Sequence, residues 1–302
     1  MCPTKSQYMN FGPIRFIPGE NRGRYPNCNS IYIKKAGFLI DPSSNRNIIR
    51  HIRDEEGIEI VCLTHWHEDH FMHIDLLDDL PLWTSEKDAE PLASMDVFLD
   101  WYGINKPDGK ELREVIRPRL EKQFNFKPRN PDRLLKDGEI IDLGTVTMEV
   151  ILTPGHSPGH LAFFFQEPEV LFLGDYNLDT FGPWYGDPYS SLEQTIDSIN
   201  RLRKIPAKIW MTGHGNGIME ENPGKKWDIY LGTVQRRENE LLDYLSISRS
   251  LDEIVERWIV LGKPKEPLDY NKFGEKAHVI KHLDRLMRKR LIQTRNGQYS
   301  RV

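Results

Sequence analysis

The sequence predicts an α/β protein in which two strand-rich halves are separated by helices and followed by a small helix–helix–hairpin tail. Short apolar and β-branched runs recur along residues 14–40 and again along residues 139–173, and such runs are typical of strands. Segments with apolar residues at helical spacing lie between and after them. Of the 302 residues, 38% are hydrophobic and 28% are charged, which fits an ordinary globular protein.

The first strand-rich half is predicted to span residues 14–63. Between residues 14 and 40, apolar runs alternate with turn residues, which indicates a strand meander. Residues 45–55 are predicted to form a helix, and residues 58–63 form a short β-branched and apolar run that is typical of a buried strand. Residues 86–123 are charged and predicted to be mostly helical, so they separate this half from the next.

The second half is predicted to contain strands within residues 139–150 and 161–173. The following segment, 192–202, has apolar residues at a spacing that places them on one face of a helix: Leu192, Ile196, Ile199 and Leu202. Two strand-rich halves with such amphipathic helices suit a layered α/β fold.

The C-terminal tail differs from the rest of the chain in charge. Residues 248–302 contain 13 Lys and Arg against 7 Asp and Glu, a net charge of +6, whereas residues 1–247 carry −10 of the total of −4. A helix is predicted after Ser250, a candidate N-cap residue, a second from about 275 to 290, and a hairpin turn at Asn296-Gly297. We therefore predict a main domain over 1–247 and a winged-helix-like domain over 248–302.

The strand at 58–63 runs directly into the most informative motif of the chain. His65, His67 and His70, together with Asp69, fall within six consecutive residues. Imidazoles suit zinc or iron, and a carboxylate adds an anionic oxygen ligand. A polar loop that hydrogen-bonds locally would explain one histidine but not three at this spacing, so the motif predicts a metal site.

Three later segments place a histidine or an aspartate among glycines after an apolar run. They are TPGH ending at His156, LGD ending at Asp175 and GHG around His214. Glycine lets the backbone turn sharply and approach an ion closely. Each segment alone is compatible with an ordinary turn, but the four motifs in this order are specific.

These four motifs resemble those of the metallo-β-lactamase superfamily, in its dinuclear hydrolase branch. The resemblance covers about residues 14–245 and implies a four-layer αββα sandwich as the catalytic domain. It implies two divalent metal ions, for which zinc is favoured over iron or manganese. The implied ligands are His65, His67 and His156 at the first site, Asp69, His70 and His214 at the second, and Asp175 between them. The tail resembles the small C-terminal domain of the β-lactamase-like protein 2 hydrolases.

Substrate contacts are predicted mainly in the aromatic loop 176–189, which follows Asp175 directly. The candidate substrate-binding residues are His160, Tyr176, Phe181, Trp184 and Tyr185. Packing of the loop against the helix at 192–202 is the alternative interpretation. Trp101 and Tyr102 are candidates for a lid or for the core, and Glu68 is expected to support the metal loop.

The resemblance implies a dinuclear metal-dependent hydrolase in which a metal-bridging hydroxide, oriented by the catalytic residue Asp69, attacks a small ester, thioester or lactone. A metal-dependent ribonuclease or phosphodiesterase is the main alternative, because a basic run could contact RNA phosphates. That run contains Lys281, Arg285, Arg288, Lys289 and Arg290. The opposite net charges favour docking of the tail on the main domain. A mononuclear-iron persulfide dioxygenase and a non-catalytic binding protein are further alternatives.

The sequence also predicts a cytoplasmic protein without membrane contacts, and it does not predict an oligomeric state. No apolar run approaches the roughly 20 residues that span a bilayer. Residues 1–7 lack the apolar core of a signal peptide. Three cysteines, Cys2, Cys28 and Cys62, give no disulfide framework, and Cys62 is expected to be a small buried side chain.

Overall fold

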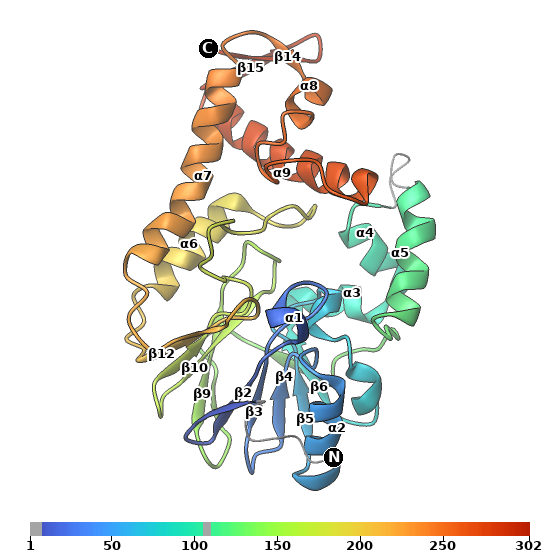
Figure 1. Ribbon diagram of the computed structural model, residues 1–302, viewed down its shortest axis with the longest axis vertical. Coiled ribbons are helices and arrows are strands. Elements are labelled where there is room, and N and C mark those ends of the chain that lie inside the picture. The colour runs from blue at the N-terminus through green and yellow to red at the C-terminus, as the bar shows by residue number, and fades with distance from the viewer. Residues whose placement is uncertain (1–7, 105–109) are drawn as a thin grey trace.

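Two β-sheets lie between helical layers in the computed structural model (Figure 1), which describes residues 8–104 and 110–302. The N-terminal segment used in the signal-peptide argument, with Cys2, lies outside the described residues. The first sheet has seven strands in sequence order. They are β1 (Met9–Phe11), β2 (Ile14–Ile17), β3 (Ser30–Ile33), β4 (Phe38–Ile40), β5 (Ile60–Cys62), β6 (Leu82–Ser85) and β7 (Arg133–Leu135).

The second sheet has six strands in the order β13-β12-β11-β10-β9-β8. They are β8 (Ile140–Asp142), β9 (Thr147–Leu152), β10 (Leu161–Phe165), β11 (Val170–Phe172), β12 (Ile209–Met211) and β13 (Ile218–Met219). The strands β9, β10 and β11 pair antiparallel, whereas β11 and β12 pair parallel. The strands predicted in residues 14–63 and 139–173 are therefore present, and they sort into two separate sheets.

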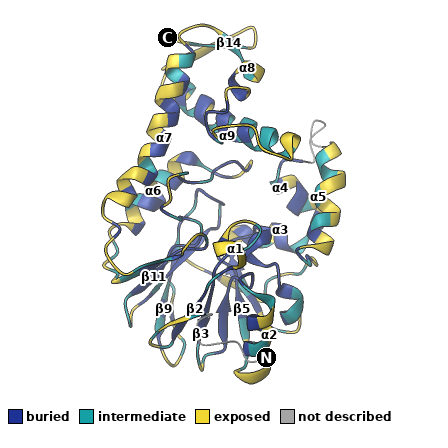
Figure 2. Ribbon diagram, in the orientation of Figure 1, coloured by how far each residue is buried: buried dark blue, intermediate teal, exposed yellow. Residues whose placement is uncertain are grey.

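Alternating side chains of each strand explain why the sheets stack. In β3, Ile31 and Ile33 face the second sheet, whereas Tyr32 faces the helices on the other side. Phe163 and Phe165 of β10 meet them from the second sheet. Cys62 is a fully buried member of this inter-sheet core, as the sequence predicted. Figure 2 shows many strands of the two large sheets in the dark blue of buried residues.

Helices cover the outer face of each sheet. The first sheet is covered by α2 (Arg46–Glu55), whose buried isoleucines join the core that also contains α3 (Ala89–Ala93) and α4 (Met95–Trp101). The second sheet is covered by α6 (Leu192–Leu202) and α7 (Lys225–Tyr244). These layers confirm the predicted αββα sandwich. Asn45 caps α2 by accepting hydrogen bonds from two backbone N–H groups of its first turn.

Short helices and one further long helix complete the main part of the chain. These are α1 (Glu20–Gly23), η1 (Glu68–His70), η2 (Ile74–Leu77), η3 (Glu86–Asp88) and α5 (Lys110–Lys122). The described residues contain no helix that is both long and apolar enough to cross a bilayer. The predicted cytoplasmic location stays a prediction.

The C-terminal residues form two helices and a three-stranded sheet in the order β14-β16-β15. The elements are β14 (Arg249–Ser250), α8 (Leu251–Val255), α9 (Leu268–Arg288), β15 (Ile292–Arg295) and β16 (Gln298–Arg301). Ser250 and Glu253 form a reciprocal capping box at the start of α8. Asn296 and Gly297 both have positive φ, 50° and 74°, which fits the predicted hairpin turn. The winged-helix identity and the boundary at residue 247 stay predictions.

The prediction that the second C-terminal helix begins near residue 275 is wrong, because α9 begins at Leu268. Residues 268–274 include Asn271 and Gly274, which are weak helix formers in isolation. Tertiary contacts outweigh this propensity, since Phe273 packs against the core around α4 and α5. The carboxylate of Glu275 also accepts hydrogen bonds from the backbone N–H groups of Val260 and Leu261, at 2.9 and 2.7 Å.

Ion pairs and apolar packing hold α9 against α6 and α7. Leu241 and Leu245, in α7 and just after it, share one core with α9. Glu238 of α7 is 1% exposed and pairs with Arg285 and Lys289. Other members of the basic run are also engaged: Arg288 pairs with Glu193 at 3.0 Å, and Lys281 donates to the backbone carbonyls of Pro188 and Ser190. These contacts favour docking, and RNA binding stays a prediction.

Candidate metal centre

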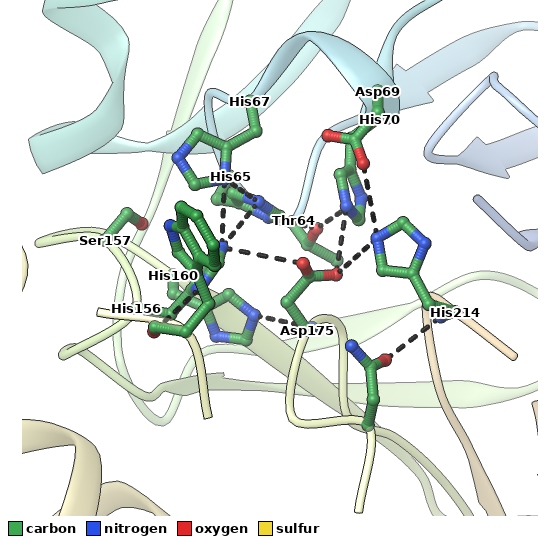
Figure 3. A network of polar contacts seen from close by, with 12 residues as sticks. Thr64, His65, His67, Asp69, His70, His156, Ser157, His160, Asp175 and His214 are labelled. Carbon is green, nitrogen blue, oxygen red and sulfur yellow. Dashed lines mark hydrogen bonds and ion pairs between the residues drawn. The ribbon is translucent and has the colours of Figure 1, made fainter. Parts of the chain in front are cut away.

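The predicted ligands lie in loops that follow strands, all at one edge of the sandwich. The motif with His65, His67, Asp69 and His70 follows β5, and His156 follows β9. The remaining two, Asp175 and His214, follow β11 and β12, which run parallel and so end at the same edge. Figure 3 shows that all seven side chains point toward a common centre.

The first group consists of three imidazoles whose ring nitrogens converge. His65 Nε2 lies 2.9 Å from His67 Nδ1, and His156 Nε2 lies 3.1 and 3.0 Å from these two atoms. All three residues are buried. Three nitrogens that face one another this closely present lone pairs to one point, which is the arrangement expected of a metal site with three imidazole ligands.

The second group joins the first through Asp175. His214 Nε2 lies 3.3 Å from Asp69 Oδ2 and 3.3 Å from Asp175 Oδ1, and His70 Nε2 lies 3.0 Å from the same Asp175 oxygen. The other oxygen, Oδ2, lies 3.6 Å from His156 Nε2. Asp175 thus directs one oxygen toward the first group and its other oxygen toward the second, which is the geometry expected of a bridging ligand.

Two buried atoms of this centre show that its polar groups are not satisfied by protein alone. His70 Nε2 and Asp175 Oδ1 lie 3.0 Å apart, but neither makes a hydrogen bond of acceptable geometry with a described residue. A buried polar atom without a partner is costly, and a nitrogen and an oxygen in this state beside further donor atoms fit divalent metal ions. The structure therefore places suitable ligand atoms together, and metal binding itself stays a prediction.

The opposite ring nitrogen of each candidate histidine ligand is held by a protein group. The contacts are His65 Nδ1 with Thr64 Oγ1 at 2.9 Å, His67 Nε2 with Asp187 Oδ2 at 3.1 Å, His70 Nδ1 with Asp41 Oδ2 at 2.9 Å, His156 Nδ1 with the Trp184 carbonyl at 3.2 Å, and His214 Nδ1 with the Gly23 carbonyl at 2.8 Å. Such contacts fix the tautomer and the orientation of each ring.

Burial and charge set the protonation of these groups. Burial, together with the neighbouring His67, lowers the pKa of His156 to about 4. For His67 burial acts in the same direction, but the carboxylates of Asp187, Asp69 and Glu68 together outweigh it and raise the pKa to about 9. Because a metal binds the neutral imidazole, binding at His67 must release a proton.

A cavity of about 580 Å³ lies over the centre and receives the side chains of His67, Asp69, His156, Asp175 and His214. Two of the candidate substrate-binding residues, Phe181 and Trp184, line it, and substrate binding by them stays a prediction. Tyr102, a candidate lid residue, also lines it. Further wall residues come from distant segments that the sequence did not connect with the site: Tyr25, Ile104, Ile116 of α5, Leu261, and Tyr270 and Phe273 of α9. The C-terminal helix is thus part of the cavity wall.

Three predicted substrate contacts lie behind this wall rather than on it. His160 Nδ1 contacts Thr153 Oγ1 at 2.8 Å, and its Nε2 accepts a hydrogen bond from the Asp175 backbone N–H at 3.0 Å. Tyr176 donates to the Thr153 carbonyl at 3.0 Å. Tyr185 is fully buried and faces α9. These side chains support the loops, so their prediction as cavity-lining residues is wrong.

Tyr185 connects the loop above the first ligand group to the C-terminal helix. Its hydroxyl contacts His282 Nε2 at 2.8 Å and accepts a hydrogen bond from Arg237 Nη1 at 2.7 Å, and its backbone N–H donates to His278 Nε2 at 3.3 Å. A Cβ atom at Gly186 would lie 2.4 Å from the His278 ring, so only glycine allows this approach. Residues 184–187, which hold His156 and His67, are thereby fixed to α9.

Sequence reasoning missed Asp41 and Asp187, the two carboxylates that orient ligating rings. Asp41 follows β4 directly, and Asp175 stands three residues after the end of β11, so the position of Asp41 at a strand end was an available signal. Asp187 lies within the aromatic loop and carries no such signal. Its role depends on a contact with a residue 120 positions away in the chain.

A family model described as the metallo-beta-lactamase superfamily matches residues 22–214. The chain is similar to the acyl-coenzyme A thioesterase MBLAC2 of Gallus gallus, with 29% identity over 181 residues, 58% of this chain and 58% of that protein. It is 27% identical over 188 residues to the beta-lactamase-like protein 2 homolog of Caenorhabditis elegans, 62% of this chain and 52% of that protein. The chain spans about half the length of the curated relatives it matches.

Among solved structures, a metallo-beta-lactamase family protein from Thermus thermophilus superposes with a TM-score of 0.70. The alignment covers 96% of this chain and 99% of that chain at 20% sequence identity. At this identity the likeness concerns the fold, and it agrees with the two-sheet sandwich described above.

Proposed function

The chain belongs to the metallo-beta-lactamase superfamily, and from this membership we propose that it is a dinuclear metal-dependent hydrolase of small esters, thioesters or lactones. The observation that carries the proposal is the convergence of seven ligand side chains beneath a cavity with aromatic walls. The similarity to a protein named as a thioesterase supports an acyl substrate. Zinc is the favoured metal because five of the seven ligands are imidazoles.

The ligand set divides into two half-sites that share Asp175. His65, His67 and His156 would hold the first ion, and Asp69, His70 and His214 the second. Bound divalent ions would activate water and polarise the scissile carbonyl oxygen. Asp69 lines the cavity and lies beside His214, which supports a role for its carboxylate in orienting a water molecule toward the substrate.

The cavity walls would position the acyl group and exclude water from it. Phe181 and Trp184 stand beside the ligand groups, with ring centroids 6.5 Å apart and nearly parallel planes. Tyr270 and Phe273 of α9 close the cavity from the C-terminal side. Binding sites for small molecules generally combine such apolar walls with few polar groups.

The test is a parallel assay of the metal-loaded protein with thioesters, lactones, single-stranded RNA and persulfides, together with metal analysis. We expect two metals per chain and hydrolysis of acyl substrates. In the Trp184→Ala variant, KM should rise more than kcat falls for bulky acyl groups, because the ring contributes binding that ground and transition states share.

Other results would replace the proposal. RNA cleavage with a steep salt dependence and no acyl hydrolysis would favour the ribonuclease alternative. A single iron per chain with dioxygen consumption would favour the persulfide dioxygenase. Full acyl hydrolysis with metal at only the first half-site would refute the dinuclear mechanism but keep the hydrolase.

A further inference from the structure

One carboxylate and two phenols form a cluster in the cavity wall beside the candidate metal centre. Glu68 Oε1 accepts a hydrogen bond from the Tyr25 hydroxyl at 2.8 Å, and Glu68 Oε2 accepts one from the Tyr102 hydroxyl. All three residues line the cavity, and Glu68 is 4% exposed. Glu68 belongs to none of the converging ligand groups found among the described residues. We call these three side chains the acceptor cluster.

The hydrogen-bonding capacity of the acceptor cluster is one-sided. A carboxylate only accepts hydrogen bonds, and a phenol has a single hydrogen to donate. Both phenol hydrogens are directed to Glu68, and the hydroxyl of Tyr270, a further cavity residue, is hydrogen-bonded to Tyr25. Because Tyr25 gives its only hydrogen to Glu68, Tyr270 is the donor of that bond, so the cluster offers its remaining lone pairs and no donor to the cavity. A ligand group that contacts it must therefore supply the hydrogen, as a hydroxyl, phenol or amine does. An anionic group would be repelled and would leave the acceptors unpaired.

Apolar side chains line the same cavity as the acceptor cluster. They come from four separate segments and comprise Ile104, Ile116, Leu261 and Phe273. The Tyr102 ring stacks on that of His67, with centroids 6.1 Å apart and planes 22° apart. The cluster is therefore continuous with the first ligand group, and one molecule of moderate size can contact both. Aromatic walls of this kind favour flat or ring-shaped ligands.

We propose that this part of the cavity is a subsite for a ring-bearing acyl group, aromatic or alicyclic, that carries a hydroxyl or another uncharged hydrogen-bond donor. The ring would lie among the apolar side chains, and its donor would meet Glu68 and the phenol oxygens. This assignment of the ring to an acyl group rests on the proposed function. The preference for a donor-bearing ring rests on the acceptor cluster alone.

Binding of small probes tests the preference without any reaction. Three matched probes are 4-propylphenol, 4-propylanisole and 4-propylbenzoate, titrated calorimetrically into the metal-free and the metal-loaded protein. We expect the phenol to bind roughly tenfold more tightly than its methyl ether, because a hydrogen bond to a charged group is gained. In the metal-free protein the benzoate should bind most weakly. Equal affinities for the phenol and the ether would overturn the proposal.

Two variants shift this preference in opposite directions. Glu68→Gln replaces an acceptor-only group by one that also donates, so the preference for the phenol should fall to about threefold or less. Tyr102→Phe removes the hydrogen bond that Glu68 accepts from the Tyr102 hydroxyl. One carboxylate oxygen then becomes available to the probe, so the preference for the phenol over the ether should rise. Tyr189→Phe, a matched control at a hydroxyl that contacts Asp100 outside the cavity, should leave it unchanged.

An unchanged preference in folded Glu68→Gln would overturn the proposal. If that variant does not fold, Tyr102→Phe decides the question, since a preference that stays constant or falls contradicts the acceptor cluster. A melting curve of each variant establishes folding.

Hydrolysis of a matched thioester pair separates the two proposals. The pair carries 3-(4-hydroxyphenyl)propionyl and 3-(4-methoxyphenyl)propionyl groups on the same thiol. We expect kcat/KM to favour the hydroxyl compound roughly tenfold. If neither compound is hydrolysed but the phenol preference in binding persists, the proposed function fails and the subsite stands. If both are hydrolysed with equal kcat/KM and the phenol and ether bind equally, the subsite fails and the proposed function stands.

Discussion

Replacing Asp187 should weaken metal binding at the first half-site and leave the second nearly unchanged. Asp187 Oδ2 lies 3.1 Å from His67 Nε2, and the two side chains are 8% and 9% exposed. The contact fixes the ring so that Nδ1 points at His65 and His156. Without it the ring is free to rotate, and part of the binding free energy is spent on ordering it again.

The expected size follows from this geometry. Loss of a partner that orients a ligand typically costs ten- to a hundredfold in metal affinity, or about 1.4 to 2.8 kcal/mol. Because Asp187 lines the cavity, water can enter the space that Asp187→Ala leaves and bond to His67 Nε2. We therefore expect the lower end, roughly tenfold, when the two proteins are compared above about pH 9, where His67 is neutral even beside Asp187. Near pH 7 the loss should be smaller, because Asp187→Ala also removes the charge that raises the His67 pKa, so the metal has less proton to displace. Asp187→Asn keeps an acceptor oxygen without the charge, so its effect should be only a few-fold.

The assay is a competition titration with a zinc chelator that resolves two affinities per chain. Asp41→Asn serves as the matched control, since Asp41 contacts His70 and should affect the second half-site instead. Melting curves of the metal-free variants establish that the fold is kept. The reasoning is refuted if Asp187→Ala leaves both affinities at their wild-type values, or weakens only the half-site that Asp187 does not touch.

Three further predictions concern catalysis, the tail and pH. Asp69→Ala should reduce acyl hydrolysis more than it reduces metal content at the first half-site, where three imidazoles remain. Metal content and turnover are measured on the same sample, and activity that persists in the variant would contradict this prediction. Removing residues 246–302 should uncover Leu241 and lower the melting temperature, and an unchanged melting temperature and unchanged kinetics would refute docking. Burial lowers the pKa of His278 to about 3 in the folded protein, whereas a histidine in the unfolded chain has a pKa of about 6.5. The contribution of His278 to stability is therefore complete above about pH 6.5. It is lost as the pH falls toward 3, because the unfolded chain binds the proton first. His278→Gln should therefore show a smaller drop in melting temperature between pH 7 and 5 than the wild type, and an equal drop would contradict this account.

The sequence by itself predicted the layers of the fold and the positions of the candidate ligands. Strand and helix periodicity is local, so α6 has the predicted bounds at Leu192 and Leu202, and α2 begins one residue after the predicted start at residue 45 and ends at the predicted residue 55. The ligands were predictable for a similar reason. Each stands at the end of an apolar strand beside glycine or in one short motif, and these signals need only a few neighbouring residues.

Only the tertiary structure decided which side chains support the ligands and which line the cavity. Asp187 reaches His67 across 120 positions, and Tyr185 reaches His282 across 97. The same long-range packing starts α9 at Leu268 despite weak local propensity, and it places Tyr270 in the cavity wall. Hydrogen bonds and apolar contacts between distant segments form only when the sheets and helices have come together, so no local pattern of residues specifies them.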